Sequence, residues 1–426
     1  KQQNIEVTFL DYGATVYNLL VPDKDGNMET VLLAYDKLET YIEGSMYLNS
    51  IVGPSSGRIK DAEFTIDNTH YQIDRNFMDT VNLHGGKDAL SFKFFHYEIK
   101  DDQNQSEITF TYYTEDTNSL YPGNQVIQII YTVKEGELHI QFKGETSEPT
   151  LLNLTSHMYF NLSGNIKRKI LDNELQIKAS KTISLDEKFV PYKVTSLKGT
   201  HLDFLEKKTI SDNFFEGIYD LPEQGIDNPY LLDEVSFGSP CATLKDPLSK
   251  RKMEVYTTYP AIVCYTHNYP NDLVLANVED HVAHLAICFE TQNPPNGINM
   301  DGLEKSILRP GETYCHNTLY KFYVNTALTG VTTATPLCGI MVSSTNPTQT
   351  ITNNISTFTS GLSKIYYCHL PNLFNRENNK LVDISGNMEI SGDININDGG
   401  KLMTNNSTFY LLNENTESIY FGGNAS

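Results

Sequence analysis

Residues 151–164 read LLNLTSHMYFNLSG, a stretch in which side-chain character alternates with a period of two. The alternation predicts a β-strand, because successive residues of a strand point to opposite faces. One face is apolar apart from one serine and holds Leu152, Leu154, Ser156, Met158, Phe160 and Leu162. The other face is polar and holds Asn153, Thr155, His157, Tyr159 and Asn161. Such a polar row is either a solvated strand face or one wall of a binding cleft, and this strand taken alone favours the solvated face.

Strand-like runs recur along most of the chain. EITFTYYT (107–114), QVIQIIYTV (125–133) and MEVYTTYPAIVCYT (253–266) are apolar or alternating, and turn-forming pairs such as Asp25-Gly26 and Glu135-Gly136 separate such runs. Helical periodicity is scarce, and the clearest helix candidate is the short segment 38–42. We therefore predict an all-β fold built as a large antiparallel sandwich.

The charge balance restricts the classes of partner. Lys and Arg number 32 and Asp and Glu number 53 in 426 residues, giving a formal net charge of −21. A chain this acidic repels nucleic acid and anionic membrane surfaces, so we expect neither as a partner. Neutral small molecules or other proteins are the expected partners.

Cysteine usage and hydropathy indicate the compartment. The six cysteines form no CxxC pair and no close His/Cys cluster, so we expect no metal site built on them. Cys264 and Cys288 lie inside apolar runs, which is typical of reduced core thiols and favours a cytoplasmic location. We expect no transmembrane helix, because no apolar run approaches about 18 residues, and the start of the sequence shows no signal-peptide pattern.

Composition changes near residue 325 and predicts a domain boundary there. Residues 1–325 alternate strands with charged turns, whereas residues 326–426 are poor in charge and rich in Ser, Thr and Asn. In the second segment, Ile-Ser-Gly occurs twice and Ile384, Ile390 and Ile396 are six residues apart. This spacing is either a short β-solenoid or fibre-like repeat or a chance pattern. We expect a smaller β-rich C-terminal module, and a homo-oligomer assembled through it is one open role.

Four further residues outside the opening stretch could take part in chemistry. His84 directly precedes Gly85-Gly86, a pair that permits either a tight turn or the close approach of a ligand. Glu290 ends a strand on the face opposite the apolar one, and the alternative is a carboxylate pointing to solvent. Arg58 follows a Gly/Ser-rich loop and Asp227 lies in a turn, where a surface ion pair and a turn-forming Asp are the alternatives. Together with His157 they form a set of imidazoles, carboxylates and one guanidinium suited to proton transfer.

These segments, in this order, resemble the aldose 1-epimerase (galactose mutarotase) family. The matching pieces span about residues 4–324 and read DYGATVYNLLVPDKDG, GRI, NLHGG, YPGN, NLTSHMYFNLSG, GIDNPYLL, CFETQNPPNGIN and ILRPGETYCHNTLYKF. The resemblance implies a β-supersandwich fold with a sugar cleft on one curved sheet. It also implies an isomerase that interconverts the α and β anomers of free aldohexoses such as galactose and glucose, with no metal and no cofactor.

The resemblance also implies roles for the residues. Glu290 would be the general base for the C1 hydroxyl, and His157 the general acid for the ring oxygen. The sugar-binding side chains would be those of His84, Arg58 and Asp227, and Tyr159 and Asn161 would orient His157 or line the cleft. His267 is an additional candidate at a strand end.

Three departures from the family pattern bear on which sugar fits: GPSSGRI keeps only the end of a longer signature, Pro294-Pro295 replaces a frequent Pro-Asp, and Thr155-Ser156-His157 replaces a frequent Thr-Asn-His. None of them removes the acid or the base. Two other readings remain open, a mutarotase acting on sugar phosphates and a non-catalytic carbohydrate-binding or structural protein that assembles through its tail. A sugar-phosphate enzyme would need a second basic group near the cleft.

Overall fold

The computed structural model describes residues 1–44, 46–114 and 119–324, together with the backbone of four short strands between 382 and 411. The chain divides into two compact units, Lys1–Thr326 and Ala327–Ser426. Side chains are described in the first unit, which contains every residue that the sequence singles out for chemistry.

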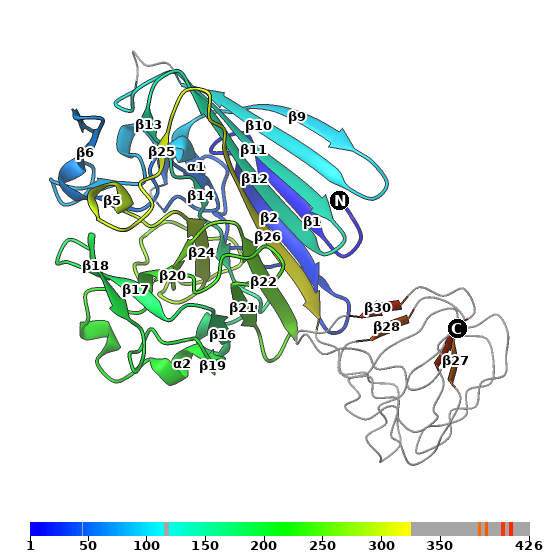
Figure 1. The fold of residues 1–426 in the computed structure, drawn as a ribbon. Coiled ribbons are helices and arrows are strands. Elements are labelled where there is room, and N and C mark those ends of the chain that lie inside the picture. Colours follow the sequence, from blue (N-terminus) through cyan, green and yellow to red (C-terminus); the bar gives the residue numbers. More distant parts are fainter. Residues whose placement is uncertain are drawn as a thin grey trace. The chain divides into compact units, whose positions relative to one another are not determined.

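A nine-stranded antiparallel sheet forms one layer of the first unit. Its longest strands are β11 (Gln125–Lys134), β12 (Glu137–Thr146) and β26 (Tyr314–Val324), which lie side by side (Figure 1). The sheet continues on one side through β10 (Ser106–Tyr113) and β9 (His96–Asp101), and on the other through β22 (Arg251–Thr257), β21 (Ala242–Lys245), β16 (Glu174–Ile177) and β19 (Lys208–Thr209). Burial alternates along β11 and β12, as the sequence predicted for strands with one core face.

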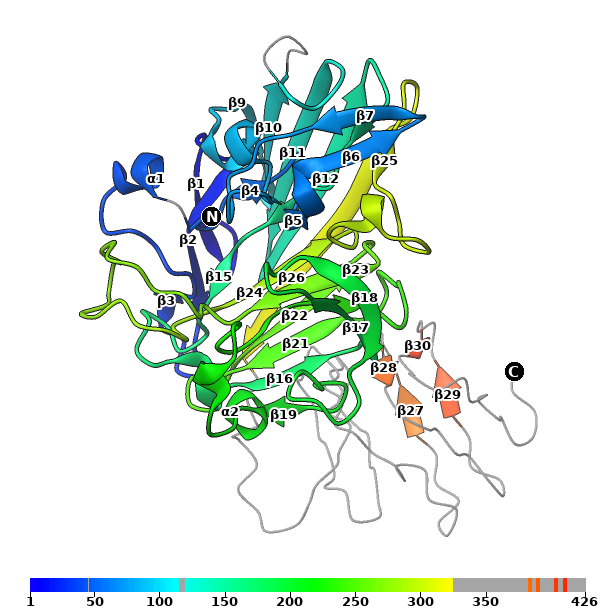
Figure 2. The same ribbon diagram turned by 90° about the vertical axis from the view of Figure 1, so that its left-hand side faces the viewer.

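A second, six-stranded antiparallel sheet carries the candidate site. In spatial order its strands are β15 (Tyr159–Phe160), β24 (Ile287–Gln292), β23 (Ala261–Tyr265), β20 (Asp227–Leu231), β17 (Lys181–Leu185) and β18 (Pro191–Ser196). Figure 2 shows β17, β18, β23 and β24 in front of the layer that holds β21 and β22. All six residues of β24 are buried, so this strand is covered on both of its faces.

Smaller elements complete the unit. A three-stranded sheet consists of β1 (Glu6–Leu10), β2 (Thr15–Pro22) and β3 (Met28–Thr30). Four strand pairs are β4 (Ile51–Val52) with β14 (Thr155–Ser156), β5 (Arg58–Ile59) with β8 (Asn82–Leu83), β6 (Glu63–Ile66) with β7 (Thr69–Gln72), and β13 (Thr150–Leu151) with β25 (Ile307–Leu308). The helices are single turns: α1 (Thr40–Glu43), α2 (Ile210–Asn213), η1 (Lys60–Ala62), η2 (Gly86–Asp88), η3 (Leu90–Phe92), η5 (Ile170–Asp172), η6 (Ile218–Asp220) and η7 (Gly297–Asn299). None of the helices in the described part of the chain is long and apolar enough to cross a bilayer.

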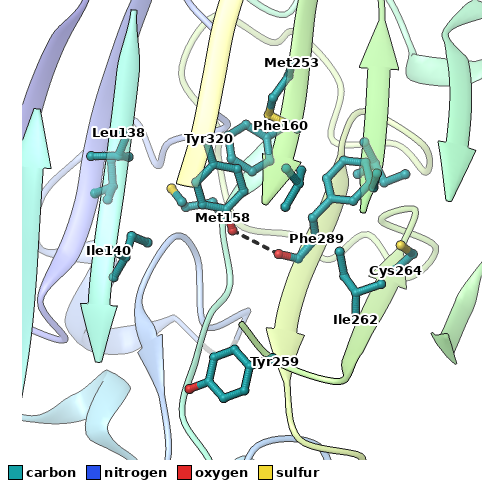
Figure 3. Close-up of a cluster of buried hydrophobic side chains, with 14 of the residues drawn as sticks. Leu138, Ile140, Met158, Phe160, Met253, Tyr259, Ile262, Cys264, Phe289 and Tyr320 are labelled. Atoms are coloured by element: carbon teal, nitrogen blue, oxygen red, sulfur yellow. Dashed lines mark hydrogen bonds between the residues drawn. The ribbon is translucent and has the colours of Figure 1, made fainter. Parts of the chain in front are cut away.

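The main hydrophobic core joins the two large sheets. Apolar side chains of β11, β12 and β26 belong to the same buried cluster as Phe289 of β24 and Ile262 of β23. Figure 3 shows Phe289 and Tyr320 in this cluster, where the Tyr320 hydroxyl donates a 3.0 Å hydrogen bond to the main-chain carbonyl of Phe289. Burial of apolar surface stabilises a fold by about 25 cal/mol per Å², so this large buried cluster holds β24 against the long strands. The all-β prediction is confirmed.

The opening stretch is not the single strand that its alternation predicted. It forms three two-residue strands, β13, β14 and β15, which belong to three different sheets. The reason is that side chains from elsewhere take the place of a neighbouring strand: the Asn49 side-chain oxygen accepts a 2.9 Å hydrogen bond from the Tyr159 main-chain N–H. The Asn153 amide likewise bonds both main-chain groups of Asn293. The alternation still predicts burial correctly for the apolar face, since Leu152, Leu154, Met158, Phe160 and Leu162 all enter the core.

The second unit is described through four strands: β27 (Val382–Ile384), β28 (Met388–Ile390), β29 (Leu402–Thr404) and β30 (Phe409–Leu411). β27 pairs with β29 and β28 pairs with β30, and both pairings are parallel. The repeat residues Ile384 and Ile390 end β27 and β28, while Ile396 lies outside the described residues. The solenoid or fibre-like reading of the repeat stays a prediction.

Candidate active site

A cavity of about 550 Å³ is lined by residues from every strand of the six-stranded sheet. Its size falls in the range of small-molecule sites, roughly 300–1,000 Å³. Six of the seven residues named from the sequence line it: Arg58, His84, His157, Tyr159, Asp227 and Glu290. They come from segments far apart in the chain, so the fold brings together what the sequence predicted to act together.

Glu290 is positioned by the alternation of β24. Ile287 and Phe289 enter the hydrophobic core, so Cys288 and Glu290 face the opposite side, and Glu290 reaches the cavity. Only 3% of Glu290 is exposed. Burial, with a further contribution from the negative charge of Asp227, raises the pKa of this carboxyl well above its ordinary value, while Arg58 opposes the shift.

His157 lies in the connection between β14 and β15 and is held by both its main chain and its ring. Its N–H donates to the Ser50 carbonyl at 2.9 Å, and its carbonyl accepts from the Asn49 N–H at 3.0 Å. Its Nε2 lies 3.5 Å from Oε1 of Glu290. Burial lowers the pKa of His157 to about 4, and a hydrogen bond to its own main chain opposes the shift.

His84 is presented by a turn that only glycine permits. Gly85 and Gly86 both have left-handed φ angles, 92° and 62°, and a Cβ on Gly85 would lie 2.6 Å from the Gly53 carbonyl oxygen. The Gly57 N–H donates a 3.1 Å hydrogen bond to Nδ1 of His84. Nδ1 is therefore unprotonated and Nε2 carries the hydrogen, which makes Nε2 a hydrogen-bond donor. Burial keeps the pKa of His84 well below its ordinary value.

Arg58 and Asp227 form a half-buried polar pair beside the acid and the base. Nη2 of Arg58 lies 3.6 Å from Oδ2 of Asp227. The guanidinium lies near two aromatic rings that pack edge-to-face on each other, 4.9 Å from the Phe77 centroid and 5.2 Å from the Phe189 centroid, an arrangement that stabilises a cation. Burial raises the pKa of Asp227, and the Arg58 charge opposes this. Nε of Arg58 is buried without a hydrogen-bond partner.

Tyr159 and Asn161 differ in their placement. Tyr159 lines the cavity, donates its hydroxyl hydrogen to the Met46 carbonyl at 2.8 Å and stacks on His157. Asn161 does not line the cavity, because its amide nitrogen donates to the main-chain carbonyls of Arg168 and Leu285, each at 2.7 Å. Of the two roles expected for Asn161, orienting His157 or lining the cleft, the structure gives no support to the second, and the side chain holds main-chain carbonyls in place.

His267 also stays outside the cavity lining. Its Nε2 lies 3.0 Å from Nε2 of His281, and its ring packs on the edge of Tyr159. Sequence reasoning missed the aromatic walls, which are Tyr47, Phe77, Phe189, Tyr265 and Tyr269. Tyr265 ends a recognisable strand run, but the other four lie in turns and loops, where no periodicity indicates which way a side chain points.

Three of these side chains also fall within reach of a single metal ion. Ligand atoms of His84, His157 and Glu290 lie within 4.8 Å of one another. A metal-bound imidazole nitrogen must offer a lone pair, and the other ring nitrogen then carries the hydrogen. The hydrogen bond from Gly57 places the His84 lone pair at Nδ1 instead, so the donor set fits a polar ligand that accepts a hydrogen bond better than it fits a cation.

The arrangement is suited to moving one proton onto a ligand while removing another. Glu290 and His157 lie side by side at the floor of the cavity, with an imidazole N–H and a guanidinium beside them. A carboxylate and an imidazole so placed act as a general base and a general acid. The chemistry defined by this geometry is proton transfer at two neighbouring oxygen atoms of a small polar molecule.

Comparison with known proteins gives the family. A family model described as aldose 1-epimerase matches residues 1–321. The chain belongs to the aldose 1-epimerase family. The galactose mutarotase of Rattus norvegicus is 31% identical over 327 residues, covering 76% of this chain and 93% of that protein. The aldose 1-epimerase of Escherichia coli (strain K12) is 26% identical over 321 residues, covering 74% and 91%.

Solved structures of aldose epimerases have the same fold as the first unit. The crystal structure of galactose 1-epimerase from Lactobacillus acidophilus NCFM matches with a TM-score of 0.67 and 27% identity, covering 76% of this chain and 92% of that one. An aldose epimerase homologue from C. elegans has the same fold, with a TM-score of 0.69 at 24% identity, and covers 76% of this chain and 97% of that one. The supersandwich that the resemblance implied is the fold of the first unit.

Proposed function

We propose that the protein is an aldose 1-epimerase that interconverts the α and β anomers of free aldohexoses in the cavity described above. The observation that carries the proposal is the 3.5 Å separation of His157 Nε2 and Glu290 Oε1 inside a buried cavity. In a hemiacetal the hydroxyl oxygen and the ring oxygen are bonded to the same carbon, C1, so the acid and the base must lie close together. Relatives named galactose mutarotase and aldose 1-epimerase support this choice.

The reaction balances within the pair. Glu290 takes the proton of the C1 hydroxyl while His157 gives a proton to the ring oxygen, the bond between C1 and the ring oxygen breaks, and an open-chain aldehyde forms. Rotation about the C1–C2 bond presents the other face of the aldehyde. The ring oxygen then attacks C1, His157 takes the proton back and Glu290 returns one to the new hydroxyl. The pair holds one proton throughout, and no electron leaves the sugar.

The other side chains have matching tasks. Nε2–H of His84 is a donor for a sugar oxygen. Arg58 and Asp227 offer a donor and an acceptor for neighbouring hydroxyls, and Tyr159 supports the ring of His157. Burial strengthens each of these interactions by excluding water.

Optical rotation tests the proposal directly. Freshly dissolved α-D-galactose or α-D-glucose should change rotation faster with the protein than in buffer. Glu290→Gln and His157→Gln should each lower kcat by about 10²- to 10⁴-fold, the usual contribution of a general base or acid. Circular dichroism would show whether the variants are folded. A folded parent protein with no rate above buffer would contradict the proposal.

The cavity favours a neutral sugar over a sugar phosphate. Arg58 is the one cationic side chain among the described residues that line it, and it is already paired with Asp227. A phosphate group carries a charge of about −1.5 to −2 at neutral pH, so we expect a phosphate site to hold a second basic group. We therefore expect hexose 6-phosphates to compete weakly with free hexoses, and tight competition would favour the sugar-phosphate alternative.

Partners and location follow from charge and cysteine state. The net charge of −21 opposes binding to nucleic acid and to anionic membrane surfaces. Cys241, Cys264 and Cys288 are buried free thiols, which fits a reducing compartment such as the cytoplasm. A homo-oligomer through residues 326–426 stays a prediction, which sedimentation of the full chain would test.

A further inference from the structure

One strand contacts both ring nitrogens of His157. β24 places Oε1 of Glu290 3.5 Å from Nε2 and Sγ of Cys288 3.5 Å from Nδ1. The two side chains share a face because they are two residues apart in a strand. Cys288 is fully buried and does not line the cavity, whereas Glu290 does. Cys288 therefore contacts the imidazole at Nδ1, away from the cavity, and Glu290 contacts it at Nε2, on the cavity side.

Aromatic packing alone leaves the orientation of this imidazole undecided. The centroid of the Tyr159 ring lies 5.0 Å from that of the His157 ring, with an angle of 21° between the ring planes. The Tyr47 ring also stacks on the His157 ring, with a centroid distance of 6.3 Å and an angle of 22°. Stacking fixes the plane of the ring. A half turn about the Cβ–Cγ bond keeps that plane but exchanges ring nitrogens with ring carbons, so stacking does not distinguish the two orientations. A hydrogen bond at Nδ1 does distinguish them.

We propose that Cys288 is a positioning residue for the reaction: its sulfur accepts the hydrogen bond of His157 Nδ1–H, which selects one ring orientation and leaves Nε2 as the nitrogen that exchanges a proton with the sugar. This inference rests on the function proposed above. It assigns Cys288 no contact with the substrate.

The chemistry of sulfur suits this position. A carboxylate behind the ring would stabilise the imidazolium ion and hold the proton that His157 must donate. A thiol is a weak, uncharged acceptor, so it orients the ring with little effect on proton release. Burial, together with the charge of Glu290, raises the pKa of Cys288 well above its ordinary value and keeps the thiol uncharged.

Three variants separate positioning from packing. Cys288→Ala removes the sulfur acceptor but leaves the hydrogen bond of His157 to its own main chain, and Cys288→Ser retains a hydroxyl in place of the thiol. The matched control is Cys264→Ala, because Cys264 is as fully buried on the neighbouring strand β23 and, like Cys288, belongs to a buried hydrophobic cluster, but not to the one that contains Cys288 and Tyr159. Loss of one neutral hydrogen bond corresponds to about a tenfold change in rate. We expect Cys288→Ala to lower kcat about tenfold with little change in KM, Cys288→Ser to recover part of that loss, and Cys264→Ala to retain the parent kcat.

Two kinetic results would overturn the inference. One is an unchanged kcat in Cys288→Ala. The other is an equal loss of kcat in Cys288→Ala and Cys264→Ala, which would assign the effect to core packing. A serine variant as slow as the alanine variant would also count against it.

A measurement independent of activity keeps the two proposals distinguishable. In ¹⁵N-histidine spectra of the full chain at neutral pH, with the His157 signals assigned by their loss in His157→Gln, Nδ1 should be protonated and Nε2 unprotonated. Cys288→Ala should show a mixture of the two tautomers. A parent protein with the hydrogen on Nε2 overturns the role of Cys288 even if mutarotation is fast. The expected tautomer in a protein without mutarotase activity would leave the Cys288 contact standing and overturn the proposed function.

Discussion

Burial shifts the pKa values of His157 and Glu290 in opposite directions, and this determines how many protons the pair carries. The pKa of His157 is lowered to about 4 and that of Glu290 is raised well above its ordinary value. Each shift favours the uncharged form, so over a wide pH range the pair holds one proton. Mutarotation needs one proton on the pair, on His157 when the ring opens and on Glu290 when it closes. Burial favours the state with this proton on Glu290, which is the state that closes the ring, so ring opening requires the proton to move to His157.

Arg58 has two aromatic neighbours in addition to Asp227. The ion pair is long, at 3.6 Å, and both ring centroids lie within the distance of about 6 Å at which a ring attracts a cation. The aromatic contacts restrict where the guanidinium can point. They also supply an attraction that stays available when the charge is desolvated.

Phe189→Leu is therefore expected to weaken sugar binding. Leucine keeps the site apolar but lacks the ring face that attracts the guanidinium, an interaction worth about 0.5–2 kcal/mol. KM should rise by about 2- to 30-fold, with a smaller change in kcat, in initial-rate polarimetry over a range of sugar concentrations. The control is Tyr192→Leu, which changes an exposed aromatic residue in β18. Equal KM values for the two variants would contradict the role given to Phe189.

Sequence reasoning identified charged site residues better than aromatic ones. Glu290 and His157 sit in segments whose letters resemble a family pattern, and Glu290 also follows from strand alternation. Phe77 and Phe189 lie outside the strands; Phe77 precedes Met78, which has a left-handed φ angle, and Phe189 has a left-handed φ angle itself. No local rule predicts which way such side chains point, because the turn conformation and its long-range contacts decide it.

β24 is the element on which both core and site depend. One face of the strand buries Phe289 against Tyr320 of β26 (Figure 3). The other face presents Cys288 and Glu290 to His157. A register shift of one residue would exchange these faces and place a carboxylate in the core. The core contacts therefore fix the position and direction of Glu290, the proposed general base.

The interrupted segment 151–164 shows where element prediction failed. Period-two alternation correctly predicted which side chains are apolar and buried, but it could not show that polar side chains of this and other segments bond main-chain groups that a neighbouring strand would otherwise pair. Those hydrogen bonds join Asn153 to Asn293 and Asn49 to Tyr159. Contacts over more than a hundred residues leave no local signal in the sequence.

Asn153→Ala tests how much stability comes from a side chain that pairs main-chain groups in place of a neighbouring strand. The change leaves the buried N–H and carbonyl of Asn293 without these partners, and each buried unpaired polar group costs about 1–3 kcal/mol. We expect the free energy of unfolding in urea to fall by about 1–3 kcal/mol or more. Asn104→Ala, in an exposed turn, should change it by less than about 0.5 kcal/mol. An Asn153 variant as stable as the Asn104 variant would show that the pairing carries no stability.

In the first unit, burial shifts the pKa values of several titratable side chains in the direction that favours their uncharged form. The pKa values of His157 and His316 are lowered to about 4 and that of His267 to about 3, and His84 is also shifted well downward. In each case the largest cause is burial. Glu290 and Asp227 are shifted upward for the same reason. The fold therefore couples its stability to pH through buried groups, separately from its acidic surface.

We expect the free energy of unfolding to fall as the pH is lowered from 6.5 to about 4.5. In this window the unfolded histidines bind protons, since their ordinary pKa is about 6.5, while the four folded histidines stay neutral, so acid favours the unfolded chain. Glu290 and Asp227 oppose the trend, because their folded pKa values are raised and the stability that they contribute is lost as the pH rises. They are two groups against the four histidines named above and His139, His201 and His284, whose pKa values burial also lowers. Urea unfolding at half-unit pH steps measures the net slope, which should be on the order of 1 kcal/mol per pH unit. His316→Gln should make the slope shallower without touching the cavity, because His316 does not line it. A stability that is flat or rises toward pH 4.5 would show that these histidines take up protons in the folded state.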